Sequence, residues 1–477
     1  MISLPGLNLA SQPIEPTNAP ASTTIRTQDL AANTEYRFEV AFGKNLTIKL
    51  QSGTAEFFGT ELGPATTYTF EGTKGAIFTW HGCRLEIGGE VESDYVAEET
   101  PMMSVANLHF ALEDLRDKSI ASGNADLGPR VLVVGPDNSG KTSLVKILTS
   151  YAVKTGRQPM VINLDSREGM LSIPGSFSAA AYSSIIDIEQ GWGSSPISGP
   201  SPIPVKQPLV YQYGLKDAEE GKVFKPLVTR MALAVTSRLE EDTASKQAGF
   251  IIDSSGSISQ GKNGVYDNIE HIVSEFSVNI VITLGSERLY SDLSRKFSTR
   301  SPDPADAISV IRLDKSGGCI DRSEPYMRAL RHSQIRSYFF GSGEALPLAP
   351  SSQMADFADL NIYRVKEADS GFVSSAGDAA DYGYGYGNGS GGEVEEIYEK
   401  VGVTAAELQD SLLAVTMAGA GDKHGAIRDA CVRGFVYVAD VDEAKRKVKL
   451  LSPMPGSVAG NALVLGRWPE DVPGLVN

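Results

Sequence analysis

The sequence lacks several features by which other protein classes are identified. Its three cysteines (Cys83, Cys319 and Cys431) are far apart and form no CxxC pair, and its five histidines are equally scattered. This pattern argues against a disulfide scaffold and against a zinc framework. It is typical of a cytosolic or nuclear protein with reduced thiols.

Long apolar runs and net positive charge are also missing. No window reaches the roughly 18 apolar residues that a membrane span requires. The first 20 residues contain no basic segment followed by an apolar block, so we expect neither a membrane anchor nor a secretory signal. The formal net charge is −16. Because non-specific nucleic-acid binding relies on Lys and Arg, we expect any RNA contact to be weak or made through partners.

What the sequence does contain divides it into successive segments, since 477 residues are too many for one core. Residues 1–20, rich in Pro, Ala, Asn and Thr, are expected to be disordered. Residues 21–105 hold short alternating runs such as YRFEVAF and NLTIKLQ, which predict an N-terminal β-sandwich. Residues 106–345 alternate apolar strands with helices, which predicts an α/β domain with a mostly parallel sheet. Residues 346–477 predict a small β-rich domain that contains a disordered loop at about 368–393.

Within the α/β segment, apolar spacing predicts helices over 107–122, 141–151, 225–241 and 265–276. Strands are predicted at VLVVG, PMVINLD, PLVYQY, GFIID, NIVITL and SVIRL. The continuous apolar character of these runs indicates a sheet that is buried on both faces. The Pro/Ser/Gly-rich insertion at 191–208 is expected to be a mobile loop.

A phosphate-binding loop is the most specific motif. Gly135 to Thr142 fits GxxxxGK[ST] without mismatch, between an apolar strand and an amphipathic helix. In this arrangement the backbone N–H groups and the helix N-terminus face the phosphates. Lys141 would reach the β- and γ-phosphates, and the hydroxyl of Thr142 would ligate Mg²⁺. The sequence therefore predicts a P-loop nucleotide-binding domain.

Two strand-end acids could complete this site. Asp165 ends VINLD and Asp253 ends GFIID, and ligands of parallel sheets gather at such strand ends. Either carboxylate could hold Mg²⁺ or act as a base, and either could instead cap a turn. No Asn-Lys-x-Asp signature occurs, which disfavours a GTPase.

Seven segments in a set order resemble one known family. They are YRFEV, AEFFGTEL, AIFTWHGC, GPxxxGKT, LDxxxGxxSIPG, KSGG and RxxxIRxYFFG. The chain is similar, from about Thr34 to Pro455, to the Clp-type RNA 5′-hydroxyl polynucleotide kinases, which double as cleavage and polyadenylation factor subunits. The resemblance implies the same division into an N-terminal β domain, a P-loop domain and a C-terminal β domain.

The resemblance also implies roles for individual residues. Glu35 and Lys74 match positions expected to touch adenine, and Asp165 matches the acid beside the attacking hydroxyl. The phosphate-binding stretch is matched by Asn138, Ser139, Gly140, Lys141, Thr142 and Ser143. The lid segment is matched by Arg328, Arg331 and Arg336. An arginine over the γ-phosphate would stabilise phosphoryl transfer; without the resemblance, these arginines could equally form a solvated basic face.

Two departures from the family pattern concern the phosphate acceptor. Active kinases carry Gly-Gln after the strand-end acid, whereas this chain has Ser166, Arg167 and Glu168 before the next glycine. They also carry a tryptophan on which the terminal base stacks, and Ser257 stands at that place. Loss of a stacking interaction worth about 1–3 kcal/mol lowers the affinity for a 5′-terminal nucleotide roughly ten- to hundredfold. Fungal cleavage factor IA subunits of the family share both departures.

The resemblance thus predicts an ATP-binding, non-catalytic subunit of the nuclear pre-mRNA 3′-end cleavage and polyadenylation machinery. ATP and Mg²⁺ would be structural, with Mg²⁺ held at Thr142 and Asp165. The expected partners are the cleavage factor IA scaffold protein and other 3′-end processing subunits. Two alternatives remain open at this point: an active RNA 5′-hydroxyl kinase, and a slow ATPase that gates complex assembly. For both of them the candidate catalytic residues are Lys141, Asp165 and the three lid arginines.

Overall fold

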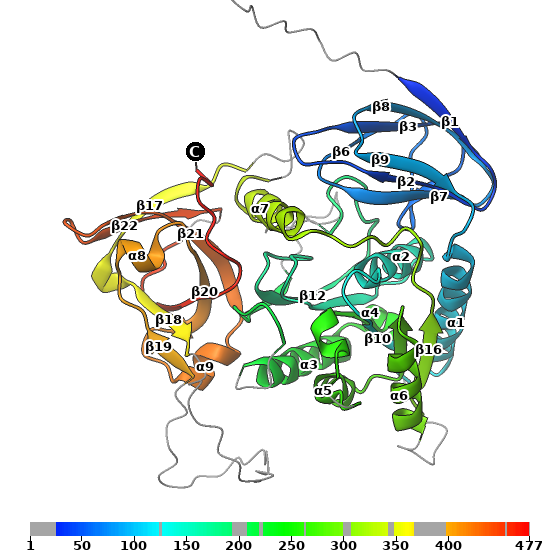
Figure 1. The fold of residues 1–477 in the computed structure, drawn as a ribbon. Helices are drawn as coiled ribbons and strands as arrows, with labels where there is room; N and C mark the ends of the chain where they lie inside the picture. Colours follow the sequence, from blue (N-terminus) through cyan, green and yellow to red (C-terminus); the bar gives the residue numbers. More distant parts are fainter. Residues whose placement is uncertain are drawn as a thin grey trace, which may run out of the picture.

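The computed structural model describes residues 25–123, 126–192, 208–218, 223–261, 264–298, 307–341, 348–366, 397–453 and 456–476. The disorder predicted for 1–20 and for about 368–393 lies outside the described residues, as does most of the 191–208 insertion. The described chain forms a β-sandwich, a central α/β part and a C-terminal β part, and helix α7 (Glu324–Phe340) lies between the first and the last of them (Figure 1).

The N-terminal part is a sandwich of two antiparallel sheets. One sheet is ordered β1 (Arg26–Leu30), β8 (Cys83–Gly89), β3 (Leu46–Gly53) and β6 (Thr67–Phe70). The other is ordered β5 (Thr60–Glu61), β4 (Glu56–Phe57), β7 (Lys74–Thr79), β2 (Thr34–Glu39) and β9 (Ser93–Ala97). Phe38, Ile48, Ile77 and Leu85 are buried in the core of the sandwich. Alternating apolar residues place these side chains on the inner faces, as the sequence predicts.

The central part holds a seven-stranded sheet. Its order is β13 (Leu209–Gln212), β12 (Ser176–Ala181), β11 (Met160–Leu164), β14 (Phe250–Ser254), β10 (Arg130–Val134), β15 (Ile280–Leu284) and β16 (Ser309–Leu313). The five strands from β11 to β16 pair in parallel, whereas β12 and β13 pair antiparallel at one edge. The predicted mostly parallel sheet is thereby confirmed.

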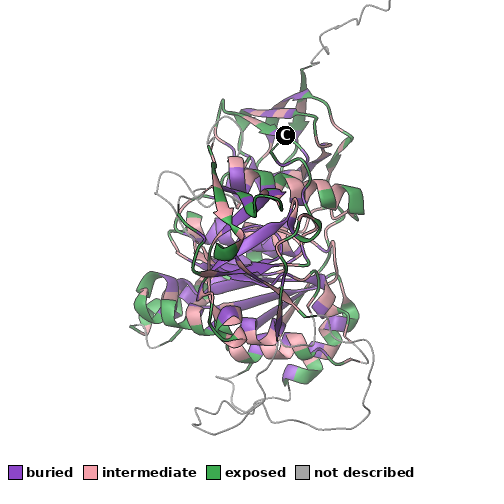
Figure 2. Ribbon diagram, turned by 90° about the vertical axis from the view of Figure 1, so that its left-hand side faces the viewer, coloured by how far each residue is buried: buried purple, intermediate pink, exposed green. Residues whose placement is uncertain are grey.

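Helices cover both faces of this sheet, and the buried strands lie between them (Figure 2). The helices are α1 (Met102–Ala121), α2 (Lys141–Lys154), α3 (Phe224–Glu241), α4 (Thr243–Ala248), α5 (Asp267–Glu275) and α6 (Glu287–Ser298). Val131 and Val133 of β10 pack in the core that α1 and α2 cover. Leu132 and Val134 point to the opposite core, which contains α3, α5 and α6. This double burial explains why the strand is apolar at every position.

Several sequence expectations need correction here. The helix expected over 107–122 begins at Met102, and PLVYQY forms an antiparallel edge strand, β13. Strand β12 was not predicted, because SFSAAA shows no alternation of apolar and polar residues. Helix α6 was also missed, although Leu289, Leu293 and Phe297 recur at a spacing of four and are buried.

The C-terminal part is a mostly antiparallel seven-stranded sheet. Its order is β17 (Ser351–Asp356), β22 (Lys447–Ser452), β21 (Val432–Asp442), β20 (Leu412–Gly419), β23 (Asn461–Leu465), β18 (Asn361–Val365) and β19 (Tyr398–Lys400), with the short helices α8 (Ala405–Leu408) and α9 (His424–Asp429) beside it. The apolar segments LLAVTMA, GFVYVADV, KVKLLSP and ALVLGRW form β20 to β23, as expected for a β-rich domain. The predicted fold class, a P-loop domain between two β-rich parts, is therefore confirmed.

Helix α7 contacts both flanking parts. Near its start, the ring of Tyr326 lies 5.4 Å from the ring of Phe42 in the sandwich. Near its end, Tyr338 packs edge-on against Phe435 of β21, and its hydroxyl oxygen accepts a hydrogen bond from the backbone N–H of Phe435 at 3.0 Å. The helix is thus fixed at both ends. Among the described residues, no helix has the length and apolar character to cross a membrane.

Candidate nucleotide-binding site

A cavity of about 750 Å³ lies where the sandwich, the P-loop and the C-terminal part meet. The predicted site residues that line it are Glu35, Lys74, Asn138, Ser139, Gly140, Lys141, Thr142, Ser143, Asp165 and Arg331. Arg328 and Arg336 are not among its lining residues. Residues up to about 430 positions apart in sequence, from β2 to Trp468, therefore share one cavity.

The phosphate-binding loop connects β10 to α2. Gly140 has a left-handed φ of 90°, and a Cβ atom there would lie 2.8 Å from the Sγ of Cys319. No side chain caps the N-terminus of α2. The first N–H groups of this helix are therefore open to an anion, as in other phosphate sites. Lys141 is buried and its Nζ donates to the carbonyl of Pro136 at 2.9 Å, which holds the ammonium group across the loop.

Two carboxyl groups lie beside the loop. The Oγ1 of Thr142 donates to Oδ2 of Asp253 at 2.5 Å, and Asp253 is buried. Burial raises the pKa of Asp253 to about 7, and burial together with the Glu168 carboxylate raises the pKa of Asp165 to about 6. Lys141 lies near both carboxyl groups, but its charge does not offset the effect of burial on their pKa values. Mg²⁺ is usually bound by one or two carboxylates together with phosphate oxygens, so these two carboxyl groups are suitable ligands for it.

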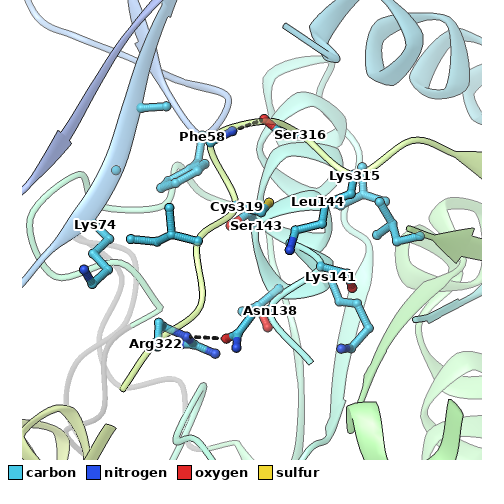
Figure 3. Close-up of a pocket in the computed structure, with 18 of the residues that line it drawn as sticks. Phe58, Lys74, Asn138, Lys141, Ser143, Leu144, Lys315, Ser316, Cys319 and Arg322 are labelled. Atoms are coloured by element: carbon cyan, nitrogen blue, oxygen red, sulfur yellow. Dashed lines mark hydrogen bonds between the residues drawn. The ribbon is translucent and has the colours of Figure 1, made fainter. Parts of the chain in front are cut away.

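The sandwich side of the cavity carries its own charged groups. The carboxylate of Glu35 accepts from Nε of Arg37 at 2.8 Å and from the hydroxyl of Thr100. Lys74 pairs with Glu39, and its Nζ lies 4.9 Å from the ring centroid of Tyr326 on α7. Figure 3 shows Lys74 and Phe58 on one side of the cavity and the P-loop residues on the other. A ligand held by the P-loop would therefore also face the sandwich.

The three lid arginines have different surroundings, so they do not form one solvated basic face. The side chain of Arg331 is 3% exposed and contacts Glu470 at 2.5 Å and Glu324 at 3.0 Å. Its guanidinium lies 4.3 Å from the ring centroid of Trp468. Arg328 is 63% exposed and lies 3.4 Å from Glu470.

Arg336 turns away from the cavity. Its guanidinium lies 5.1 Å from the ring centroid of Phe340 and reaches the carbonyl of Leu475 at 3.5 Å. Of the three arginines, Arg331 is therefore the one placed to act on a bound ligand.

Sequence reasoning missed the cations Arg322, Arg37 and Lys216 of the cavity, of which the first two have partners that bear on the site. Arg322 donates to Oδ1 of Asn138 at 3.0 Å, as Figure 3 shows, and binds both carboxylate oxygens of Glu168. Arg37 pairs with Glu35 as described above. No local signal could have identified Arg322, because it lies 154 positions from Glu168 and 184 from Asn138. A charged residue two positions before Arg37 on the same strand was a weak signal for that pair.

The two departures from the kinase pattern differ in their position. Arg167 and Glu168 line the cavity, whereas Ser257 does not. Arg167 forms ion pairs with Asp137 at 2.7 Å and with Asp217. Ser257 lies in a short 3₁₀ turn (Gly256–Ser259), and its hydroxyl lies 3.0 Å from that of Ser255.

Three family models match the chain in succession. The N-terminal β-sandwich domain of polyadenylation factor matches residues 29–119, and the mRNA cleavage and polyadenylation factor CLP1 P-loop matches residues 135–341. The pre-mRNA cleavage complex II protein Clp1 matches residues 348–470. The three models therefore cover most of the sequence, in the order that the resemblance implied.

Individual relatives agree with these models. The chain is 72% identical over 476 residues to the mRNA cleavage and polyadenylation factor CLP1 of Phaeosphaeria nodorum, with 100% of both chains covered. It is 53% identical to the factor of the same name from Botryotinia fuckeliana, with 98% of both chains covered.

Two solved structures share the fold at a TM-score of 0.80 and 28% identity, and each covers 94% of this chain. One is the wild-type Clp1p–Pcf11p complex, of which 98% of the Clp1p chain is covered. The other, covered to 99%, concerns the extended interface between Pcf11p and Clp1p and the structural basis for ATP loss in a point mutant. With 72% identity along its whole length to a named member, the chain belongs to the Clp1 family of mRNA cleavage and polyadenylation factors.

Proposed function

We propose that this chain is an ATP-binding subunit of the fungal pre-mRNA cleavage and polyadenylation machinery, cleavage factor IA, and that it retains ATP without transferring its γ-phosphate. The relatives with this name and the P-loop support the role in mRNA 3′-end formation. One observation carries the non-catalytic part of the proposal: charged side chains cross the end of the cavity where a phosphate acceptor would have to bind.

These side chains are the ones that replace Gly-Gln in the kinases. Arg167 bridges Asp137 of the P-loop and Asp217, and Glu168 is held by Arg322. Glycine would leave this space open, whereas an Arg and a Glu in ion pairs fill it. The acceptor would also have to displace these ion pairs before reaching Asp165.

The lid arginine is similarly engaged. Arg331 is paired with Glu470 and Glu324, and Trp468 lies against its guanidinium. A cation that is already neutralised by two carboxylates gives less stabilisation to the charge that develops on a transferred phosphoryl group. This arrangement supports retention of ATP rather than its use.

ATP would then act as a structural ligand between the sandwich and the P-loop domain. Asn138 to Ser143 would hold the phosphates, Lys141 would reach the β- and γ-phosphates, and Glu35 and Lys74 would face the base. Thr142, with Asp165 or Asp253, would hold Mg²⁺, which would neutralise these carboxylates. A ligand present at a thousand times its dissociation constant stabilises the folded state by about 4 kcal/mol.

The same proposal includes partners and location. A relative forms a complex with Pcf11p, and we propose that the cleavage factor IA scaffold and other 3′-end processing subunits bind this chain in the nucleus. RNA contact is expected to be weak or indirect because the net charge is −16.

A label-transfer assay tests the proposal against its alternatives. The purified full chain is incubated with γ-labelled ATP, Mg²⁺ and a 5′-hydroxyl RNA, with Lys141→Ala as the control. We expect bound, intact ATP and no labelled RNA. Labelled RNA from the wild type but not from the variant would establish the kinase alternative, which the presence of Lys141, Thr142 and Asp165 at the cavity favours. Release of labelled phosphate without labelled RNA would establish the ATPase alternative.

A further inference from the structure

The direction in which a nucleotide would lie follows from the P-loop. Lys141 and the carboxyl groups of Asp165 and Asp253 mark the end where the terminal phosphate would be placed. From the N-terminus of α2 the cavity continues past Leu144 and Ile147 to the sandwich strands. The sugar and base would therefore leave the P-loop toward the wall that contains Glu35.

The carboxylate of Glu35 is held from two sides. Arg37 donates from Nε to Oε2 of Glu35 at 2.8 Å, and Thr100 donates its hydroxyl to Oε1. Both Glu35 and Arg37 are buried, with 4% and 6% of their surfaces exposed. Each carboxylate oxygen thus keeps a lone pair in a fixed direction, and an ionised carboxylate accepts hydrogen bonds but donates none.

Arg37 is itself held by the chain that follows β9 and by the opposite side of the cavity. Its Nη2 donates to the carbonyl of Glu99 at 2.7 Å and to the hydroxyl of Ser316 at 3.4 Å. Ser316 belongs to the KSGGC segment, Lys315 to Cys319, which follows β16. The Arg37 side chain therefore connects the sandwich directly to the P-loop domain.

The two glycines of this segment make the contact possible. A Cβ on Gly318 would lie 2.8 Å from Nε of Arg37, and a Cβ on Gly317 would lie 2.7 Å from a carboxylate oxygen of Glu99. At the other end of the segment, the Sγ of Cys319 lies against Gly140 of the P-loop. In the close-up, the segment runs from Lys315, beside Leu144 of α2, past Ser316 to Cys319, which lies between Phe58 and Lys141 (Figure 3).

We propose that Arg37 and the glycines of the KSGGC segment form a positioning unit that aims the Glu35 carboxylate at the exocyclic amine of a bound adenine. Arg37 does not touch the base; it acts through Glu35. Gly317 and Gly318 act by leaving room for the Arg37 guanidinium and for Glu99. The inference rests on the proposed function, because it takes ATP as the ligand of the cavity.

Three ligands of the full chain separate this role from general support of the fold. They are ATP, purine riboside 5′-triphosphate, which lacks the exocyclic amine, and inorganic tripolyphosphate, which lacks the nucleoside. We expect the wild type to bind ATP about tenfold or more tightly than the purine analogue, since hydrogen bonds to charged groups are strong. In Gly318→Ala and Arg37→Gln, the ratio of the affinity for ATP to the affinity for the purine analogue falls to nearly one, while the affinity for tripolyphosphate changes less than about twofold.

Matched variants complete the test. Arg37→Lys keeps the charge and restores part of the ratio. Arg84→Gln removes an exposed ion pair between Arg84 of β8 and Asp29 of β1 in the same sandwich, and it leaves the ratio at the wild-type value.

Two results would overturn the inference. One is that Gly318→Ala and Arg37→Gln keep the wild-type preference for ATP over the purine analogue while Glu35→Gln loses this preference. The other is equal binding of ATP and the purine analogue by the wild type. Failure of the proposed function would look different: the wild type would bind none of the three ligands, or it would transfer label to RNA.

Discussion

The ion pair between Arg331 and Glu470 gives the sharpest stability prediction. Arg331 on α7 has a side chain that is 3% exposed, and it meets both carboxylate oxygens of Glu470 from the C-terminal part at 2.5 and 3.1 Å. Glu470→Ala would leave a buried guanidinium with one remaining carboxylate, that of Glu324. Glu324→Ala is the matched control, because it removes the other partner of the same arginine.

The burial of the two acids sets the expected magnitudes. Breaking a buried ion pair costs about 3–5 kcal/mol, but Glu470 is 22% exposed and Glu324 remains, so we expect a loss of about 2 kcal/mol. Glu324 is 67% exposed, so its removal should cost at most about 1 kcal/mol. The unfolding entropy of about 2.1 cal/mol/K per residue corresponds to about 1 °C per kcal/mol for a chain of 477 residues, so Glu470→Ala should lower the Tm by about 2 °C.

Thermal unfolding of the full chain, followed by tryptophan fluorescence, measures this difference, and Trp468 beside Arg331 reports on the same contact. Equal Tm values for Glu470→Ala and Glu324→Ala would refute the reasoning, because they would mean that burial of the pair does not determine its contribution.

Three further predictions concern ligand binding. Lys141→Ala should lose the rise in Tm that ATP and Mg²⁺ give the wild type, about 2.7 kcal/mol of stability at a hundred times the dissociation constant, as scanning fluorimetry would show. The raised pKa values of Asp165 and Asp253, about 6 and about 7, mean that the ligand-free fold binds extra protons. The stability of the ligand-free chain, measured by urea unfolding, should therefore fall as pH rises from about 4 to about 7. The affinity for Mg²⁺–ATP, measured by calorimetry, should rise over the same pH range. Asp253→Asn should make both quantities depend less on pH. Arg322→Gln, which frees Asn138, should weaken ATP binding by about 1 kcal/mol in calorimetry; a nearly unchanged affinity would contradict the role given to that contact.

Local patterns were sufficient to predict the P-loop and most strands around it. VLVVG and GFIID are apolar at every position because both faces of β10 and β14 are covered, and this burial is visible in the sequence as an uninterrupted run. The strand β12 escaped prediction because small residues (SFSAAA) give neither alternation nor bulk. The antiparallel pairing at this edge depends on chain connectivity rather than on composition.

The site was less accessible to sequence reasoning than the fold. The spacing of Gly135, Gly140 and Lys141 is enough to locate the phosphate-binding loop, since the geometry of this loop is local. The contacts that determine the function of the phosphate-binding loop are long-range. Glu470 and Arg331 are 139 positions apart in sequence, and Ser316 and Arg37 are 279 positions apart. A pattern in one sequence carries no information about such long-range pairs, so Arg322 could be found only in the folded chain, and for Arg37 the sequence offered only the weak signal of Glu35 two positions before it.

The most direct test of the central claim is the fate of ATP on the protein itself. The full chain is loaded with γ-labelled ATP and Mg²⁺, freed of unbound nucleotide, incubated for hours with 5′-hydroxyl RNA and then denatured, and the released nucleotide is identified. Retention as a structural ligand predicts recovery of intact ATP with its label and an unlabelled RNA. Recovery of ADP, with the label on RNA or in free phosphate, would contradict the account.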